Sequence, residues 1–186
     1  LGNLQRAGIE TGWVHIANSA ATLRRADAHR DLVRVGIAMY GIAPDASMEA
    51  MCSNLRQALS LRSRVSFIKK VSAGEGISYG QRYRVQEATR IATVPLGYAD
   101  GVPRRLSDVG GEVLIAGQRF PIVGRVTMDQ LMVDIGNSSI AVGDEVVLLG
   151  SQGQETITPN DWGQVLDTIG YEIVCGLSAR LARVYC

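Results

Sequence analysis

Several glycine-rich segments of this chain contain side chains that can hold or transfer a proton. Tyr79 lies between small residues in the stretch 74–80. A phenol in such a loop can donate or accept a proton. Its ring could equally cover the edge of a core. The sequence therefore marks Tyr79 as a candidate acid–base residue and leaves a structural alternative open.

Two further segments combine polar groups in unusual ways. Segment 97–101 contains Tyr98 and Asp100, and Arg104 follows it. A solvated turn held by local hydrogen bonds would have the same composition. Segment 124–130 inserts polar residues between two apolar strands, and such local rule-breaking favours a functional role. Both segments are candidates for binding loops.

Arg34 is a cation inside the apolar run 33–37, where a buried charge needs a partner. Gly36, two residues later, leaves backbone N–H groups open to an anion. An anion site and an internal ion pair are therefore both open for this segment.

The first 45 or so residues are expected to form a strand, a helix and a second strand. Residues 13–17 and 32–37 are short apolar runs, and Asn18 and Ser19 offer a cap for a helix between them. Strands that alternate with a helix are typical of a parallel α/β layer. Two such units are too few to close a barrel by themselves.

From Ser47 onward the pattern predicts a different architecture. Apolar residues three or four apart in 48–59 predict one helical stripe, and alternation over 61–67 predicts a half-buried strand. Tight turn residues 116–118 predict a hairpin. A later helix is expected to begin after the cap Thr158 and to stop at Gly170. Further strands are expected at 90–96, 112–115, 119–123, 131–135 and 145–149. The expected fold is a mostly antiparallel, barrel-like β-domain.

Bulk composition narrows the class of protein. The 186 residues are 46% apolar and 20% charged, which suits one or two compact domains. Lys plus Arg is 19 against 18 for Asp plus Glu, so neither a nucleic-acid nor a membrane partner is expected. Three cysteines and two histidines without ligand spacing predict reduced thiols in a cytoplasmic protein and no metal site. No secretory signal is expected, and a start at Leu1 suggests a piece of a longer protein.

Taken together, five segments resemble the alanine racemase family. They occur in the family's order and spacing across nearly the whole chain. Gly170-Tyr171-Glu172, with Arg180 and Arg183 beyond it, continues the match. The five are VHIANSA at 14–20, VRVGIAMYG at 33–41, ISYG at 77–80, LGYADG at 96–101 and GRVTMDQ at 124–130.

This resemblance implies a fold and an assembly. The family has an N-terminal (β/α)₈ barrel that holds pyridoxal phosphate, followed by a β-rich C-terminal domain. By this comparison residues 1–46 are the end of the barrel, and residues 47–186 are the β-domain. The expected fold class is mostly β with an α/β start. A head-to-tail homodimer is implied, in which the partner's C-terminal domain completes each active site.

The resemblance also assigns roles to single residues. Tyr79 would be the catalytic base on one face of the substrate, and Arg34 would face the pyridine nitrogen of the cofactor. Met128 and Asp129 would serve the substrate carboxylate and its loop. Thr127 departs from relatives that have cysteine there, with little expected consequence. The cofactor phosphate would be held by Ser19, Gly36, Ile37 and Tyr171, and the substrate entryway would be lined by Tyr98, Arg104, Arg125 and Ile169.

The implied activity is interconversion of L- and D-alanine, which supplies D-alanine for peptidoglycan. The second base of the family is the lysine that forms the Schiff base, and it is expected before residue 1. Neither Lys69 nor Lys70 lies in such a motif, so the chain is predicted to be inactive without the N-terminal part. Two alternatives stay open: a serine or broad-specificity racemase, and an inert β-domain that acts only in dimerisation or interaction.

Overall fold

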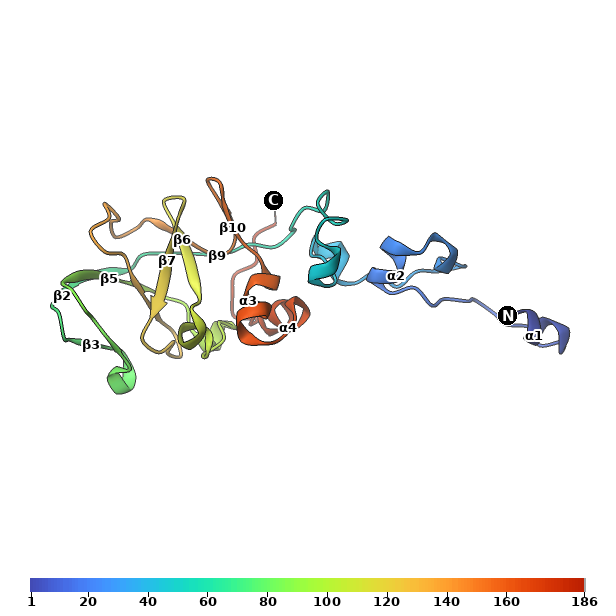
Figure 1. Cartoon of the computed structure of the whole chain (residues 1–186), viewed down its shortest axis with the longest axis horizontal. Helices are drawn as coiled ribbons and strands as arrows, with labels where there is room; N and C mark the ends of the chain where they lie inside the picture. The colour runs from blue at the N-terminus through green and yellow to red at the C-terminus, as the bar shows by residue number, and fades with distance from the viewer. Residues whose placement is uncertain (186) are drawn as a thin grey trace. The chain divides into compact units, whose positions relative to one another are not determined.

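The computed structural model describes residues 1–185, which divide into two compact units, Leu1–Ala58 and the chain from Leu59 onward (Figure 1). The first unit is made of short elements and long connections. Its helices are α1 (Gly2–Arg6) and α2 (Ser19–Arg24), with 3₁₀ turns at Ala26–Ala28, Ile37–Tyr40 and Ala46–Met48.

The expected α/β start is present in reduced form. The Asn18 side chain accepts a hydrogen bond from the Ala21 amide at 3.0 Å and so caps α2 as predicted. A parallel bridge joins Asn18 to Arg34, and the Arg34 amide donates to the Ala17 carbonyl at 2.8 Å. The two apolar runs therefore lie side by side, although they meet at a single bridge rather than along full strands.

The predicted helix over 48–59 is wrong. Met48 and Cys52 are buried, but Met51 is 53% exposed, and the chain turns after Met48 without completing an α-helix. The Ala58 amide donates to the Tyr40 carbonyl at 2.9 Å. Apolar spacing alone predicted a stripe, whereas the segment is folded back against residues near Gly41.

Most of the second unit is a curved antiparallel sheet with the strand order β1-β9-β6-β7-β8-β5-β2. Its members are β1 (Leu61–Arg64), β2 (Phe67–Val71), β5 (Thr89–Val94), β6 (Glu112–Ile115), β7 (Gln118–Val123), β8 (Leu131–Asp134) and β9 (Glu145–Gln152). A short strand, β10 (Glu155–Ile157), pairs with β9. Separate from this sheet, β3 (Gly76–Ile77) and β4 (Tyr83–Arg84) form a small hairpin.

The chain itself joins the two ends of this strand order. Only Val65 and Ser66 separate β1 from β2. The Val65 amide donates to the Asp144 carbonyl and the Ser66 amide to the Thr93 carbonyl, both at 2.9 Å. One bent strand thus pairs with β9 at one end and with β5 at the other, which closes the sheet into a barrel. The predicted barrel-like domain is confirmed, although the predicted strand 61–67 is two strands.

Aliphatic side chains of the strands fill the interior of the barrel. Leu114, Leu131, Val133 and Leu148 are fully buried in one cluster. The β6–β7 hairpin turns through Ala116 and Gly117, whose φ angles are 50° and 74°. Two successive left-handed residues match the twist of the strands they connect, so the predicted hairpin is confirmed.

Two helices follow β10. In α3 (Pro159–Leu166), the Thr158 hydroxyl accepts from the Asp161 amide at 3.1 Å and buried Trp162 packs into the core. The prediction that this helix stops at Gly170 is wrong. Asp167, at φ 59°, ends α3 instead, and Gly170 begins α4 (Gly170–Gly176).

Candidate active site

Tyr79 lies at the tip of the β3–β4 hairpin, in a 3₁₀ turn at Tyr79–Gln81. Ser78 has a φ of 60°, and its hydroxyl donates to the Arg125 carbonyl at 2.8 Å. At Gly124, a Cβ would approach the Ile77 carbonyl to 2.9 Å. The hairpin tip is therefore held closely against the predicted segment 124–130, and the Tyr79 side chain stays 74% exposed.

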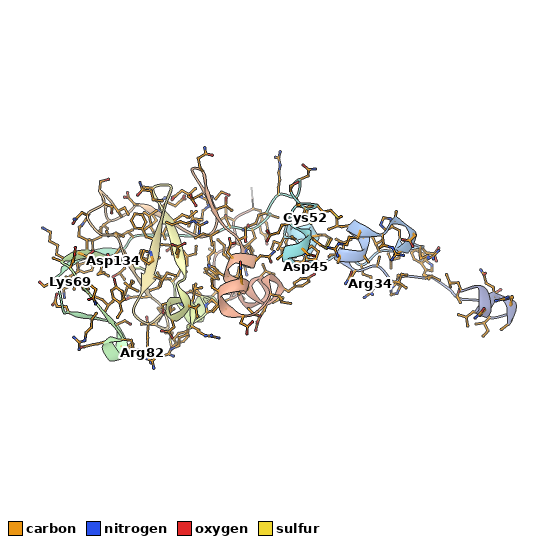
Figure 2. The ribbon with its side chains drawn as sticks, viewed as in Figure 1. Arg34, Asp45, Cys52, Lys69, Arg82 and Asp134 are labelled. Carbon is orange, nitrogen blue, oxygen red and sulfur yellow. The ribbon has the colours of Figure 1, made fainter. Side chains whose placement is uncertain are left out.

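A second contact fixes β4, the second strand of the same hairpin. The Tyr83 hydroxyl donates to Asp134 Oδ2 at 2.9 Å, and the Thr89 hydroxyl donates to Asp134 Oδ1 at 2.5 Å. Asp134 lies at the end of β8 (Figure 2). Partial burial and then this hydrogen bond to Asp134 raise the pKa of Tyr83. The pattern of the sequence did not identify this contact, because 51 residues separate its partners.

The turn that presents Tyr98 lies directly on segment 124–130. The Tyr98 amide donates to the Thr127 carbonyl and the Ala99 amide to the Met128 carbonyl, both at 3.0 Å. At Gly97, a Cβ would stand 2.2 Å from the Thr127 oxygen. Only glycine permits this approach, which brings together two segments that the sequence marked separately.

These contacts build a hollow of about 460 Å³ in the second unit. Five predicted site residues line it: Tyr79, Tyr98, Arg104, Met128 and Asp129. The predicted entryway residues Arg125 and Ile169 are not among its lining residues. Arg125 is half-buried beside the hairpin tip, and Ile169 is exposed at the start of α4.

The backbone amide of Met128 faces no acceptor among residues 1–185. The turn around it is closed by Thr127, whose amide and hydroxyl both donate to the Gln130 carbonyl at 2.9 Å. Met128 itself is 53% exposed. The hollow therefore combines an accessible phenol, which can transfer a proton, with an unpaired amide donor, which can receive a carboxylate.

Arg180 makes two ion pairs that sequence reasoning missed. Its Nε donates to Asp100 Oδ1 at 2.7 Å, and its Nη2 donates to Asp129 Oδ1 at 2.5 Å. The hydrogen bonds to Asp129 and then Asp100 raise the pKa of Arg180. Asp100 is 4% exposed, and its other oxygen accepts from the Gly97 amide at 2.8 Å. The sequence placed each residue in a motif without indicating that they meet.

In the first unit, backbone amides converge on the hydroxyl of Ser19. Ser19 is 3% exposed, and its Oγ accepts from the Gly36 amide at 2.9 Å and the Ala38 amide at 3.5 Å. The Ile37 amide donates to no acceptor within the described part of the chain. Beside Gly36, a Cβ would meet no heavy atom within 4 Å. The unpaired Ile37 amide, with open space beside Gly36, suits an oxyanion such as phosphate.

Arg34 is exposed, and its guanidinium forms no ion pair with any residue that the structure describes (Figure 2). The internal ion pair considered from the sequence is therefore absent from this part of the protein. Tyr171, predicted to join the phosphate ligands, is half-buried in α4 of the second unit.

Residues 1–185 provide neither a metal-binding cluster nor a membrane-spanning helix. No group of three or more His, Cys, Asp or Glu side chains is placed to hold a metal ion. Within the same residues, every helix is too short or too polar to cross a membrane. Cys52 is buried, Cys175 is exposed, and both are free thiols.

A barrel-like antiparallel β-sheet with a phenol-lined hollow, preceded by a small α/β segment, defines the class: a β-rich domain with a candidate acid–base site. The model of the alanine racemase C-terminal domain matches residues 58–185. That of the N-terminal domain matches residues 1–44. The chain belongs to the alanine racemase family.

Curated relatives and solved structures agree with this assignment. An alanine racemase of Carboxydothermus hydrogenoformans is 49% identical over all 186 residues, which are 50% of its own length. An alanine racemase of Nostoc is 43% identical over 99% of this chain, which corresponds to 47% of the length of that relative. The crystal structure of alanine racemase from Bacillus anthracis with bound L-Ala-P has a TM-score of 0.91 at 44% identity, covering 98% of this chain and 47% of that one. The chain thus spans about half the length of the relatives it matches.

Proposed function

We propose that this chain forms the C-terminal half of a pyridoxal-phosphate-dependent alanine racemase that interconverts L- and D-alanine. The observation that carries the proposal is the shared hollow, where the exposed Tyr79 phenol and the unpaired Met128 amide lie together. Relatives named alanine racemase support the choice of substrate. A cytoplasmic enzyme that supplies D-alanine for peptidoglycan is part of the same proposal.

Tyr79 holds and moves the proton on one face of the substrate. Racemisation removes the α-proton from one face and returns a proton to the other, so two bases must flank the carbon. A phenol hydroxyl can deliver a proton to the α-carbon, and a phenolate can take one from it. The base for the opposite face is the lysine expected before residue 1.

The substrate carboxylate is received by the backbone amide of Met128. Asp129 orders the turn that presents this amide, through its ion pair with Arg180. Tyr98 and Arg104 line the hollow and belong to the proposed entryway, together with Arg125 and Ile169. A small zwitterion suits an entry lined by phenols and guanidinium groups.

Pyridoxal phosphate, when bound, supplies the electron sink that acidifies the α-proton. Ser19, Gly36 and Ile37 would hold its phosphate, with the unpaired Ile37 amide as one donor and Tyr171 as a further ligand. Arg34 would face the pyridine nitrogen. Because arginine does not give up its proton, it would leave that nitrogen unprotonated. The proposed assembly is a homodimer in which the partner's C-terminal domain completes each active site.

The test is Tyr79→Phe in the full-length enzyme, assayed with both enantiomers of alanine and with serine. Loss of the phenolic proton is expected to lower kcat by about 10²- to 10⁴-fold in both directions. Tyr185→Phe is the control, because Tyr185 is 92% exposed. Undiminished racemisation by Tyr79→Phe would contradict the role of Tyr79, and faster turnover of serine than of alanine would contradict the substrate.

A further inference from the structure

One guanidinium group connects the two segments that line the hollow. Asp100 belongs to the turn that presents Tyr98, and Asp129 belongs to the turn that presents Met128. Arg180, from the chain after α4, donates to both carboxylates. Arg180 does not itself line the hollow, so its influence on a bound substrate has to pass through these two partners.

The two carboxylates differ in how firmly they are held. The Asp100 side chain is 6% exposed, and it also accepts from the Gly97 amide. The Ser178 amide donates to the Asp100 carbonyl at 3.1 Å, which fixes the start of the segment that contains Arg180. Asp100 is therefore the more rigid of the two carboxylates that Arg180 joins.

Asp129 is the less firmly held of the two. Its side chain is 56% exposed, and among residues 1–185 it is hydrogen-bonded only by Arg180. The Asp129 carboxylate directly follows Met128, whose amide is the unpaired donor of the hollow. The ion pair between Asp129 and Arg180 thus holds the turn directly after the Met128 amide.

Charge adds to this effect. Asp129 lines the hollow, and its negative charge would repel a substrate carboxylate placed one residue away. Arg180 pairs with that charge. Without Arg180, two uncompensated carboxylates would remain beside the place where an anionic group has to bind.

We propose that Arg180 is a positioning residue for substrate binding, which ties the Met128 turn to the buried Asp100 and shields the Asp129 charge from the substrate carboxylate. This role rests on the proposed racemase function, since it concerns the same hollow. It assigns to the end of the chain a part in substrate affinity rather than in proton transfer.

The experiment is Arg180→Gln in the full-length, cofactor-loaded enzyme, with KM and kcat measured for L- and D-alanine. Loss of two charge-assisted hydrogen bonds behind the binding amide is expected to raise KM about tenfold. The kcat value is expected to change less than KM, because Tyr79 is untouched. Arg119→Gln is the matched control, since Arg119 also bridges two carboxylates, Glu112 and Glu155, away from the hollow.

A double-mutant cycle separates positioning from a general loss of structure. Asp129→Asn alone is expected to raise KM several-fold. In the Arg180→Gln background it is expected to lower KM part of the way back, because it removes the uncompensated charge beside the substrate carboxylate. If the KM of the double variant rose by the product of the two single fold-changes, the two residues would act independently. That result would overturn the proposal. If Arg180→Gln does not fold, the variants Arg180→Lys and Asp129→Asn test the proposal instead. A wild-type KM in both of them would overturn the proposal.

Failure of the proposed function gives a different result. A full-length wild-type enzyme that racemises neither alanine nor serine contradicts the function and this role with it. An active wild type whose KM is unchanged by Arg180→Gln contradicts the role of Arg180 alone.

Discussion

At the scale of single residues, the hollow depends on how closely backbones can approach. Gly97 brings the Tyr98 turn against Thr127 and Met128, where a Cβ would lie 2.2 Å and 2.3 Å from their carbonyl oxygens. Backbone atoms cannot swing aside as a flexible side chain can. The positions of Tyr98 and Met128 are therefore coupled through a residue that has no side chain.

Gly97→Ala is expected to destabilise the second unit by about 1–3 kcal/mol, because the added methyl group overpacks against fixed backbone. It is also expected to lower racemase activity in the full-length enzyme by displacing the Met128 turn. Thermal unfolding and steady-state kinetics measure the two effects. Gly176→Ala is the control, since a Cβ there meets nothing within 4 Å; equal behaviour of the two variants would contradict the close-approach argument.

The site residues divide by how local their signals are. Tyr79, Tyr98, Arg104, Met128 and Asp129 stand in short motifs, and the structure brings all five to one hollow. The pairing of Asp100 with Arg180 spans 80 residues and has no local pattern. It could not be predicted, because only the folded barrel brings these two positions together.

At the scale of elements, the β3–β4 hairpin sets the position of Tyr79. Its second strand is held to the barrel by the hydrogen bond from Tyr83 to Asp134. Tyr83→Phe is expected to cost about 1–3 kcal/mol of stability, as for a hydrogen bond to a charged group. Urea unfolding followed by the fluorescence of buried Trp162 measures it.

The same contact predicts a pH dependence. The pKa of Tyr83 is raised in the folded protein, so its contribution is fully present below the unfolded pKa of about 10 and is lost as pH rises through the folded pKa. The stability difference between wild type and Tyr83→Phe is expected to be constant from pH 7 to pH 9 and to shrink above about pH 10. Parallel profiles for both proteins up to pH 11 would count against this contact.

Sequence patterns predicted strands better than they predicted the helix over 48–59. Short apolar segments on either side of the turn 116–118 identified β6 and β7 nearly to the residue, because the two strands are neighbours in the chain and pair with each other. Met51 matched a helical stripe but is exposed, because the segment bends back through the Ala58–Tyr40 hydrogen bond. Helical spacing of apolar residues does not show whether the chain can continue straight.

At the scale of the whole molecule, the two units differ in how much core they bury. The second unit has a large aliphatic cluster, whereas the first buries a small group around Ala43, Met48 and Cys52. Trp13 and Met39 of the first unit are 76% and 69% exposed. Limited proteolysis of the isolated chain is therefore expected to remove residues 1–58 first.

Mass spectrometry of the digest is expected to show a resistant fragment that begins near Leu59. The cause is the unequal burial, because segments with few buried apolar contacts open most often. Digestion of both units at the same rate would show that the first unit is as stable as the barrel.

The isolated 186-residue chain is expected to show no racemase activity when mixed with pyridoxal phosphate. Its only two lysines, Lys69 and Lys70, lie on exposed positions of β2, outside any cofactor motif. Racemisation assays with both alanine enantiomers test this, with the full-length enzyme as the positive control. Measurable turnover by the chain alone would mean that one of these lysines, or another group, serves as the second base.

The bent strand made of β1 and β2 also governs when this domain can form during synthesis. Arg62 pairs with Glu145, 83 residues later in the chain. A ribosome would therefore have to extend the chain past β9 before the barrel could close. Until then β1 has an unpaired edge, and such long-range pairing folds slowly. The hairpin that holds Tyr79 can form early, but its docking partners Arg125 and Asp134 emerge 47 and 51 residues after Ser78 and Tyr83, the residues that contact them.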